Sequence, residues 1–283
     1  MLYEKHIPKN IVRDISWLSF NERVLQEAMD EQNHIYDRIK FLGIFSNNQD
    51  EFFRVRVATL KRMVAYGKKA NVHLEDNPQE ILSNIYEKVA EQQLLFNKTF
   101  TNIIRQLKER NIHIKNHKQL NKVQKQFVHQ YFDEKIMNDV VPVMIESIPG
   151  VPFLKDKSIY LACTLRRTDN PSMHRYALIE VPTNHHKRFV LLPSDEGEQH
   201  IILLEDIIKF NLPHIFGAFG YDQYEGYIIK VTKDAELDID NDINSNIIAE
   251  IEKGLKNRKK GKATRFVYDK QIDDELLTYL KKR

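Results

Sequence analysis

Apolar residues recur at helical spacing through the first third of this chain, and the pattern changes near residue 110. From Asp14 to about Arg110 they return every three or four residues, and no run alternates as a strand does. After Arg110, short runs rich in β-branched and aromatic residues are separated by turn-forming segments. The pattern predicts an α+β protein of two domains. Residues 1–110 are expected to form an all-helical bundle, and residues 111–283 a mixed α/β domain with a largely antiparallel sheet.

The first helix of the bundle is expected to begin at Ser16 or Ser19. Ser19 and Glu22 have the spacing of a capping box, in which each side chain accepts a hydrogen bond from the backbone of the other residue. From this start, Trp17 and Phe20 are expected to face the core.

The segment Ser46-Asn47-Asn48 is expected to separate two helices. Its side chains compete for backbone hydrogen bonds, so a second helix over residues 35–45 should stop there. Asn48 is then the natural N-cap of a third helix, with Glu51 at the capping-box position and Gly67 at the end. The apolar stripe of this helix is Phe53, Val57, Leu60 and Val64.

A fourth, unusually long helix is expected to begin at Asn77-Pro78. This start combines a cap, a proline at the first helical position and Glu80 at the third. A near-heptad stripe follows for about eight turns. It indicates the spine of a bundle, with a dimer seam as the alternative. The stripe consists of Ile85, Val89, Phe96, Phe100, Ile103 and Leu107.

The second domain is expected to alternate short strands with a few helices. Helices are predicted around residues 123–131, 205–210 and 243–255, and a last one from Asp273; strands are predicted over 158–165, 175–181, 188–192, 201–204, 227–232 and 266–268. The first three strands are expected to form an antiparallel meander. The last helix reaches Arg283 without a cap, which predicts that the domain is truncated at its carboxy end.

Composition narrows the class of protein. The chain has 283 residues, 42% of them hydrophobic, and a formal net charge of +3, so total charge does not indicate a general nucleic-acid binder. Cys163 is the single cysteine, which excludes an intramolecular disulfide and a cysteine-rich metal site. The first residues lack the apolar core of a signal peptide. A cytoplasmic protein is expected, with membrane contact at most peripheral.

Most chemical motifs in the sequence have a simpler explanation. The acidic run 234–242 resembles a calcium loop, but it lacks the glycine and glutamate that an EF-hand requires, and a solvated strand or turn is favoured. His185 and His186 cannot both face one metal from an extended strand and are expected in a loop. No phosphate-binding glycine motif occurs, so a self-contained nucleotide-binding fold is not expected.

A basic stretch, Lys253 to Arg265, carries enough cationic charge to attract a polyanion. A solvated helix end is the favoured interpretation, and polyanion binding stays open. Few aromatic residues lie among these charges, so binding of single strands by base stacking is poorly supported.

Several segments of the chain resemble the long bacterial polyphosphate kinase, type 1. Residues 16–27, 40–48 and 50–61 are similar to its amino-terminal domain. Residues 175–182 and 232–236 are similar to the head domain that follows in the same enzyme. The segments occur in the order of the family, and the resemblance extends over almost the whole chain.

The resemblance implies a Mg²⁺-dependent enzyme that moves the terminal phosphate of ATP reversibly onto inorganic polyphosphate through a phosphohistidine. The family's phosphorylated histidine and its magnesium site lie in two carboxy-terminal domains for which this sequence has no counterpart. No catalytic residue and no metal ligand is therefore assigned here, and the chain alone is expected to be inactive. The second asparagine of Ser-Asn-Asn contacts ATP in the family, which makes Asn48 the ATP-binding candidate. Homodimer surfaces are also implied.

Two other classes of protein stay open at this point. A non-catalytic adaptor could bind partners or polyanions through the bundle and the basic stretch. A nucleic-acid module is a weaker option, and a steep loss of DNA or RNA binding with rising salt would identify it. Asn48 itself could also be a simple helix cap.

Overall fold

The computed structural model describes residues 13–70, 77–145, 154–170, 174–235 and 261–281. The chain divides into two compact units. The helical unit comprises Met1–Gln106 with Lys233–Arg265, and the mixed unit comprises Leu107–Thr232 with Phe266–Arg283.

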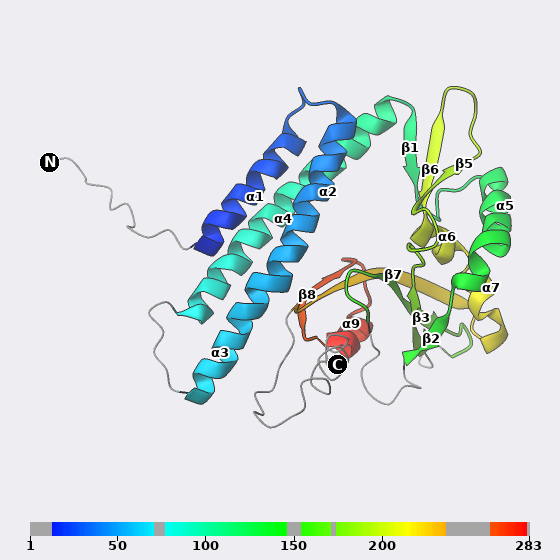
Figure 1. The fold of residues 1–283 in the computed structure, drawn as a ribbon. Helices are drawn as coiled ribbons and strands as arrows, with labels where there is room; N and C mark the ends of the chain where they lie inside the picture. The colour runs from blue at the N-terminus through cyan, green and yellow to red at the C-terminus, as the bar shows by residue number, and fades with distance from the viewer. Residues whose placement is uncertain (1–12, 71–76, 146–153, 171–173, 236–260, 282–283) are drawn as a thin grey trace, which may run out of the picture. The chain divides into compact units, whose positions relative to one another are not determined.

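The helical unit contains long helices that lie side by side (Figure 1). The bounds are α1 Arg13–Met29, α2 Ile35–Phe52, α3 Ala58–Ala70 and α4 Pro78–Glu109, with a π-helical turn, η1 Phe53–Val57, between α2 and α3. Their apolar faces meet in one cluster, so the predicted helical bundle is confirmed. The cluster consists of Leu18, Phe52, Phe53, Val57, Leu60, Leu82 and Ile85.

The predicted start of the first helix is wrong. The helix α1 already begins at Arg13, and the hydroxyl of Ser19 donates to the Ile15 carbonyl within the helix, at 3.0 Å. Trp17 packs against the apolar cluster and stacks on Phe52 with ring centroids 4.8 Å apart. Phe20 was expected in the core, but its side chain is 65% exposed.

The predicted break at residues 46–48 is also wrong, because α2 continues to Phe52 and passes through η1 into α3. Asn48 therefore lies inside α2 and caps no helix, and Glu51 has no capping-box role. The helix continues because Leu42, Phe45 and Phe52 are buried along one side of it. Gly67 does not end α3, which extends to Ala70.

The predicted start of the fourth helix is confirmed. The Asn77 side chain accepts a hydrogen bond from the backbone N–H of Gln79 at 3.1 Å, directly before α4. In the apolar stripe, Ile85 and Ile103 are buried, whereas Phe100 is 49% exposed. The stripe thus supplies core contacts along α4, as a bundle spine does.

The mixed unit holds a five-stranded sheet in the order β2-β4-β3-β7-β8 and a small sheet in the order β1-β6-β5. Strands β2, β4, β3 and β7 pair antiparallel, whereas β1 pairs parallel with β6 and β5 antiparallel with β6. The mixed fold class is confirmed. The strands are β1 Ile112–Lys115, β2 Pro142–Met144, β3 Ile159–Arg166, β4 His174–Glu180, β5 Phe189–Leu192, β6 Gln199–Leu203, β7 Gln223–Lys233 and β8 Ala263–Tyr268.

The predicted three-stranded meander is wrong in its last strand. The strands β3 and β4 pair as expected, but β5 belongs to the small sheet. The two free edges that β5 could have joined are occupied, because β2 pairs with β4 and β7 pairs with β3. Strands β1 and β2 are short and had not been predicted.

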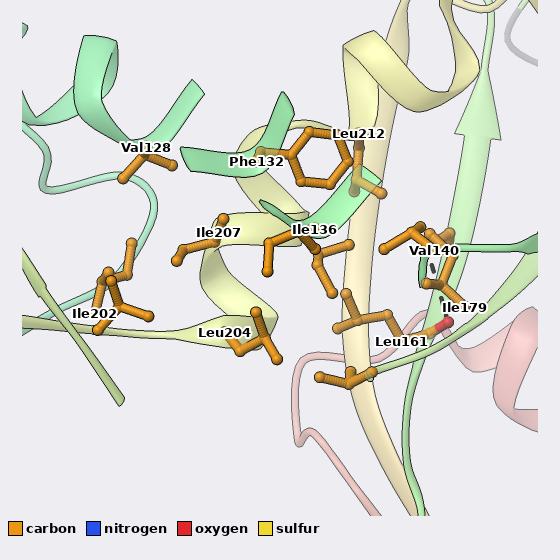
Figure 2. Packing of buried hydrophobic residues seen from close by; sticks show 14 of the residues in the cluster. Val128, Phe132, Ile136, Val140, Leu161, Ile179, Ile202, Leu204, Ile207 and Leu212 are labelled. Atoms are coloured by element: carbon orange, nitrogen blue, oxygen red, sulfur yellow. Dashed lines mark hydrogen bonds between the residues drawn. The ribbon is translucent and has the colours of Figure 1, made fainter. Parts of the chain in front are cut away.

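The helices of the mixed unit are α5 Lys122–Tyr131, η2 Phe132–Ile136, η3 Met137–Asp139, α6 Leu204–Phe210, α7 Leu212–Phe216, η5 Gly217–Phe219 and α9 Asp274–Lys281. Residues of α5, η2, α6 and α7 belong to an apolar core that both sheets share, whereas α9 packs in a second cluster. Figure 2 shows Phe132 and Ile136 pointing toward Leu212 and Ile207. The predicted helices at 123–131, 205–210 and from Asp273 are confirmed, and that at 243–255 lies outside the described residues.

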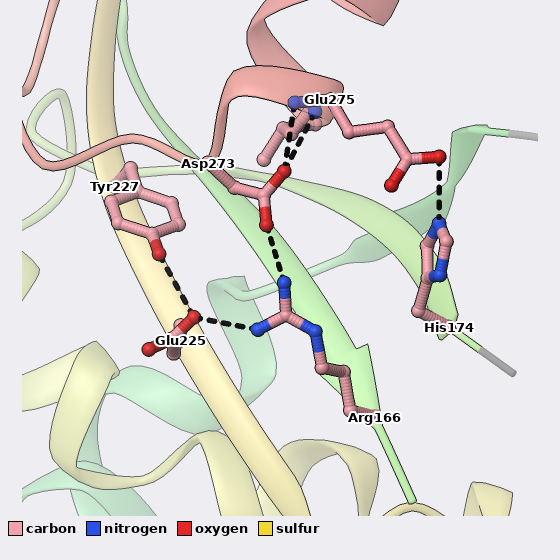
Figure 3. A network of polar contacts seen from close by, with 7 residues as sticks. Arg166, His174, Glu225, Tyr227, Asp273 and Glu275 are labelled. Atoms are coloured by element: carbon pink, nitrogen blue, oxygen red, sulfur yellow. Dashed lines mark hydrogen bonds and ion pairs between the residues drawn. The ribbon is translucent and has the colours of Figure 1, made fainter. Parts of the chain in front are cut away.

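A polar network holds the start of α9 against the five-stranded sheet (Figure 3). The Asp273 carboxylate accepts hydrogen bonds from the backbone N–H groups of Glu275 and Leu276, at 2.9 and 3.1 Å, and from Arg166 on β3. Arg166 also contacts Glu225 on β7 at 2.9 Å. Burial acts to raise the pKa of Asp273, but these backbone N–H groups and Arg166 outweigh it and lower the pKa.

Replacing Asp273 by alanine should destabilise the mixed unit by about 1–2 kcal/mol at pH 7, because the cap and one of the two carboxylate partners of Arg166 are lost. A carboxyl group whose pKa is lowered by folding stabilises above its unfolded pKa, and this contribution disappears as pH falls through the folded pKa. The difference from wild type should therefore shrink below about pH 4. Urea unfolding at several pH values measures it. Asp274→Ala, next to it but exposed, is the control.

Candidate functional site

Asn48 lies on α2 where this helix packs against α1. Its Nδ2 donates to Oδ1 of Asn21 at 3.0 Å, and Nδ2 of Asn21 donates to the Phe45 carbonyl at 3.2 Å. The second bond fixes the orientation of the Asn21 amide, so its oxygen must face Asn48. Asn21 is fully buried and Asn48 half-buried. The two asparagines thus form an ordered chain between α1 and α2.

This chain leaves part of the Asn48 amide available. Within the described part of the chain, no hydrogen bond reaches Oδ1 of Asn48, and its Nδ2 retains a second hydrogen. A carbonyl oxygen beside an N–H group complements an edge that offers one donor and one acceptor. The side chain is therefore held in one orientation by a buried partner, while its Oδ1 and one N–H have no hydrogen-bond partner among the described residues.

The carboxy-terminal end of the same helix is anchored by buried charge. Arg265 donates to Asp50 Oδ1 at 2.9 Å and to Gln49 Oε1 at 2.8 Å, and its guanidinium lies 5.2 Å from the Phe53 ring centroid. Burial lowers the pKa of Arg265, and Asp50 acts in the opposite direction. The π-helical turn η1 follows directly. Such turns are frequent at functional sites, and here it comes five residues after Asn48.

Three cations of the helical unit, taken from its described residues, face carboxylates. Lys88 lies 2.7 Å from Glu22, Arg56 lies 2.7 Å from Asp14, and Arg62 pairs with Asp234. Burial acts to raise the pKa of Glu22, but hydrogen bonds from Lys88 and Gln92, with the charge of Lys88, lower it overall. These three cations are already balanced by neighbouring anions, so a phosphate chain would have to compete with those carboxylates for them.

A separate cleft of about 340 Å³ opens in the mixed unit. Tyr160, Lys155, Glu180 and His185 line part of it. Lys155 pairs with Glu180 at 2.8 Å, and burial raises the pKa of the Tyr160 hydroxyl. The charges in the cleft are thus compensated.

The two adjacent histidines lie in the loop after β4, as predicted. Nε2 of His186 lies 2.6 Å from Oδ2 of Asp139. His185 lines the cleft and His186 is held by Asp139, so the two have different surroundings.

The donor atoms of the described residues do not form a magnesium site. Mg²⁺ prefers oxygen ligands in octahedral geometry. In the described ranges, each group of three side chains that could meet one ion contains two imidazoles and a single carboxylate. These groups are His113, Glu198 and His200, and His129, Asp133 and His214. Neither fits Mg²⁺, so no magnesium chemistry is assigned to the described residues.

Sequence patterns alone did not reveal these groups. His129 and Asp133 have the i, i+4 spacing that places two side chains on one face of a helix, which was a usable signal. His214 approaches them only through the fold.

Nothing in the sequence pointed to Asn21 as the hydrogen-bond partner of Asn48.

The charged segments singled out in the sequence lie mostly outside the described residues. In the acidic run, Asp234 is described and pairs with Arg62, so it is not a free ligand. In the basic stretch, Lys262 is described and exposed, whereas Arg265 pairs with Asp50 and adds little surface charge. Arg265 lies in the strand β8, so the predicted helix end is wrong at this residue. Across the described ranges, no helix combines the length and the apolar character needed to cross a membrane.

Both parts of the chain match models of known protein families. Residues 10–115 match the polyphosphate kinase N-terminal domain, and residues 123–283 match the polyphosphate kinase middle domain.

Individual relatives give the same result. A polyphosphate kinase of Vibrio parahaemolyticus is 38% identical over 274 residues, and the match covers 95% of this chain and 39% of the relative. A polyphosphate kinase of Escherichia coli K12 is 34% identical over 277 residues, and the match covers 96% of this chain and 40% of the relative. The crystal structure of a polyphosphate kinase from Porphyromonas gingivalis superposes with a TM-score of 0.77 at 34% identity, covering 95% of this chain and 37% of that one. The chain thus spans about two fifths of the length of these relatives.

Proposed function

This chain belongs to the polyphosphate kinase family, and we propose that it is the amino-terminal part of an enzyme that transfers the terminal phosphate of ATP reversibly to inorganic polyphosphate. The matches to the N-terminal and middle domains lie in that order along the chain, and relatives over almost all of it are named polyphosphate kinase. The Mg²⁺ ion and the phosphorylated histidine belong, in this proposal, to regions of the enzyme beyond those matched here. The chain alone is then inactive.

The role proposed for the helical unit is to hold the adenine end of ATP through Asn48. The observation that carries this role is the hydrogen-bond chain from Phe45 through Asn21 to Asn48, which orients the amide before any ligand arrives. The free Oδ1 can accept from the exocyclic amine of adenine, and the remaining N–H can donate to a ring nitrogen. This contact anchors the adenine end of ATP and helps to orient the nucleotide, and it is equally strong in the ground and transition states. Charge stabilisation at the terminal phosphate then comes from cations elsewhere.

Replacing Asn48 by alanine in the complete protein should lower kcat/KM for ATP about 30-fold, because two hydrogen bonds to the bound adenine, at roughly 1 kcal/mol each, are lost. Most of the loss should appear as a higher KM, since the adenine contact is equal in ground and transition states. The measurement is polyphosphate formation from Mg-ATP at varied ATP concentration. Unchanged values of kcat and KM for ATP would contradict the proposed contact between Asn48 and adenine.

The matched control for this experiment is Asn47→Ala, on the same helix but exposed. Loss of the Asn48 amide also leaves the buried oxygen of Asn21 without its donor, which should cost about 1–3 kcal/mol of stability. Urea unfolding of both variants must therefore accompany the kinetics. A kinetic defect measured well below the unfolding transition then reports on ATP binding and not on unfolding.

The helical unit is also proposed to contribute surfaces for homodimer assembly. Large apolar side chains are exposed on its helices, including Phe20 on α1 at 65% and Leu94 on α4 at 72%. Phe100, a member of the α4 stripe, is exposed at 49%. These helices are the proposed interface because contiguous exposed apolar surface is typical of protein–protein contacts.

A further inference from the structure

Three helical elements of the mixed unit bring two histidines and one aspartate together at the surface. His129 lies near the end of α5, Asp133 in the π-helical turn η2, and His214 on α7. One ligand atom from each lies within 4.8 Å of the others, and all three side chains are exposed. We propose that these residues form a binding site for a transition-metal ion of the Zn²⁺ type, separate from the site proposed for ATP.

The distances within this trio leave room for an ion. Nε2 of His129 lies 3.7 Å from Oδ2 of Asp133, and Nε2 of His214 lies 3.6 Å from Oδ1 of Asp133. Both distances exceed a hydrogen bond, which joins such atoms at about 2.7–3.2 Å. Ligand atoms that share a tetrahedral zinc ion with bonds of about 2.0–2.2 Å lie roughly 3.3 Å apart. A small rotation of exposed side chains brings the observed atoms to that spacing.

The tautomer of His129 is already the one that a metal requires. Its Nδ1 lies 2.9 Å from Oδ1 of Asn211, and Nδ2 of Asn211 donates to the Ile207 carbonyl at 2.9 Å. The second bond fixes the Asn211 amide, so Nδ1 of His129 carries the hydrogen and Nε2 keeps its lone pair toward Asp133. A metal-bound histidine typically donates its other N–H to an oxygen in this way. Asn211 is only 2% exposed, which makes this support rigid.

The trio of His113, Glu198 and His200 lacks this arrangement. Nε2 of His200 lies 2.8 Å from Glu198, within hydrogen-bond distance. Its Nδ1 accepts from Nε2 of Gln124 at 2.8 Å, and the Gln124 amide is fixed because the same nitrogen donates to the Pro193 carbonyl. His200 therefore carries its hydrogen on Nε2, the atom that a metal would need. The ligand atoms lie similarly close in both trios, but only the trio of His129, Asp133 and His214 is expected to bind a metal ion.

The donor set identifies the class of ion. Two imidazole nitrogens and one carboxylate suit Zn²⁺ and neighbouring first-row metals, whereas Mg²⁺ and Ca²⁺ prefer oxygen alone. Three protein ligands leave a fourth position for water. A bound ion would also connect η2 to α7, whose residues Phe132 and Leu212 already meet in the core (Figure 2). Zinc should therefore raise the melting temperature of the chain.

Equilibrium dialysis of the full chain against buffered Zn²⁺, followed by metal analysis, tests the proposal. One tight equivalent of zinc is expected in the wild-type chain, with no competition from excess Mg²⁺. His129→Gln and His214→Gln should each weaken binding at least tenfold, and the double variant should lose the equivalent together with the zinc-induced rise in melting temperature. Asp133→Asn should weaken binding less, because an amide oxygen can still coordinate.

Matched controls separate this site from general zinc binding by the 11 histidines of the chain. His185→Gln and His200→Gln each remove one histidine and should retain the tight equivalent. The proposal is overturned if the wild-type chain binds no zinc, or if the His129→Gln/His214→Gln variant retains wild-type binding. Loss of the equivalent in His200→Gln, with both exposed histidines intact, would also overturn it. Circular dichroism of each variant confirms that binding is compared between folded chains.

Discussion

Replacing Asp50 by alanine should destabilise the helical unit by about 3–5 kcal/mol, because the change leaves the buried Arg265 guanidinium without its counter-ion. The two side chains are 8% and 13% exposed, and their charged atoms are 2.9 Å apart. Burial already lowers the pKa of Arg265, and the Asp50 carboxylate opposes that effect. Without the carboxylate, the guanidinium stays charged at every accessible pH, and only the neutral Gln49 amide and the Phe53 ring offset the cost of its desolvation.

The measurement is urea unfolding of the full chain, with Asp37→Ala as the control on the same helix. Asp37 pairs with Lys40 at 3.4 Å, but both side chains are more than half exposed, so its loss should cost less than about 1 kcal/mol. The double variant Asp50→Ala/Arg265→Met should recover much of the lost stability, because it removes the stranded charge. Equal stability of Asp50→Ala and Asp37→Ala would refute this account.

This ion pair illustrates what the sequence pattern could not predict. Asp50 and Arg265 are 215 positions apart, and Arg265 belongs to a stretch whose composition indicated a solvated, basic surface. Periodicity reports which face of a helix is apolar, but it carries no information on which distant charge meets that helix. The sequence shows directly that the stretch is basic. Whether its last residue, Arg265, is buried depends on the tertiary fold.

Asn48 shows a different limit of sequence interpretation. The polar run Ser46-Asn47-Asn48 predicted a helix break because these side chains can bond to nearby backbone groups. In the structure the Asn48 amide bonds instead to Asn21 on another helix, and buried apolar residues on both sides keep α2 continuous. Tertiary packing thus outweighs a local preference of a few tenths of a kcal/mol per residue. Helix α4 was predicted correctly because its cap, its proline and its stripe all agree.

Strand pairing in the mixed unit was predicted only in part for a related reason. Short apolar runs located β3, β4 and β5 closely, because alternation and turn residues are local signals. The partner of each strand is a non-local property. β5 pairs with β6 since β2 and β7 occupy the outer edges of β4 and β3. β2 was not predicted because a strand of three residues is too short to show an alternating pattern.

Replacing Phe132 by alanine should destabilise the mixed unit by about 3–5 kcal/mol. Phe132 is fully buried where η2 packs on α7 and α6, among Ile136, Ile207 and Leu212 (Figure 2). The loss combines the removed apolar surface with the cavity left behind, which the surrounding elements fill only partly. Phe132→Leu, which retains more of the volume, should cost less than half as much.

Phe189→Ala is the matched control for Phe132→Ala, because Phe189 is an aromatic residue of the same unit that is 61% exposed. Its loss should cost less than about 1 kcal/mol. Hydrogen exchange read by mass spectrometry localises the effect. Protection should fall across α5, η2 and α6 in Phe132→Ala, while α1 and α2 retain theirs, because each unit has its own apolar cluster. If protection fell equally in both units, the two clusters would unfold as one, and the division of the chain into two separately stabilised cores would be wrong.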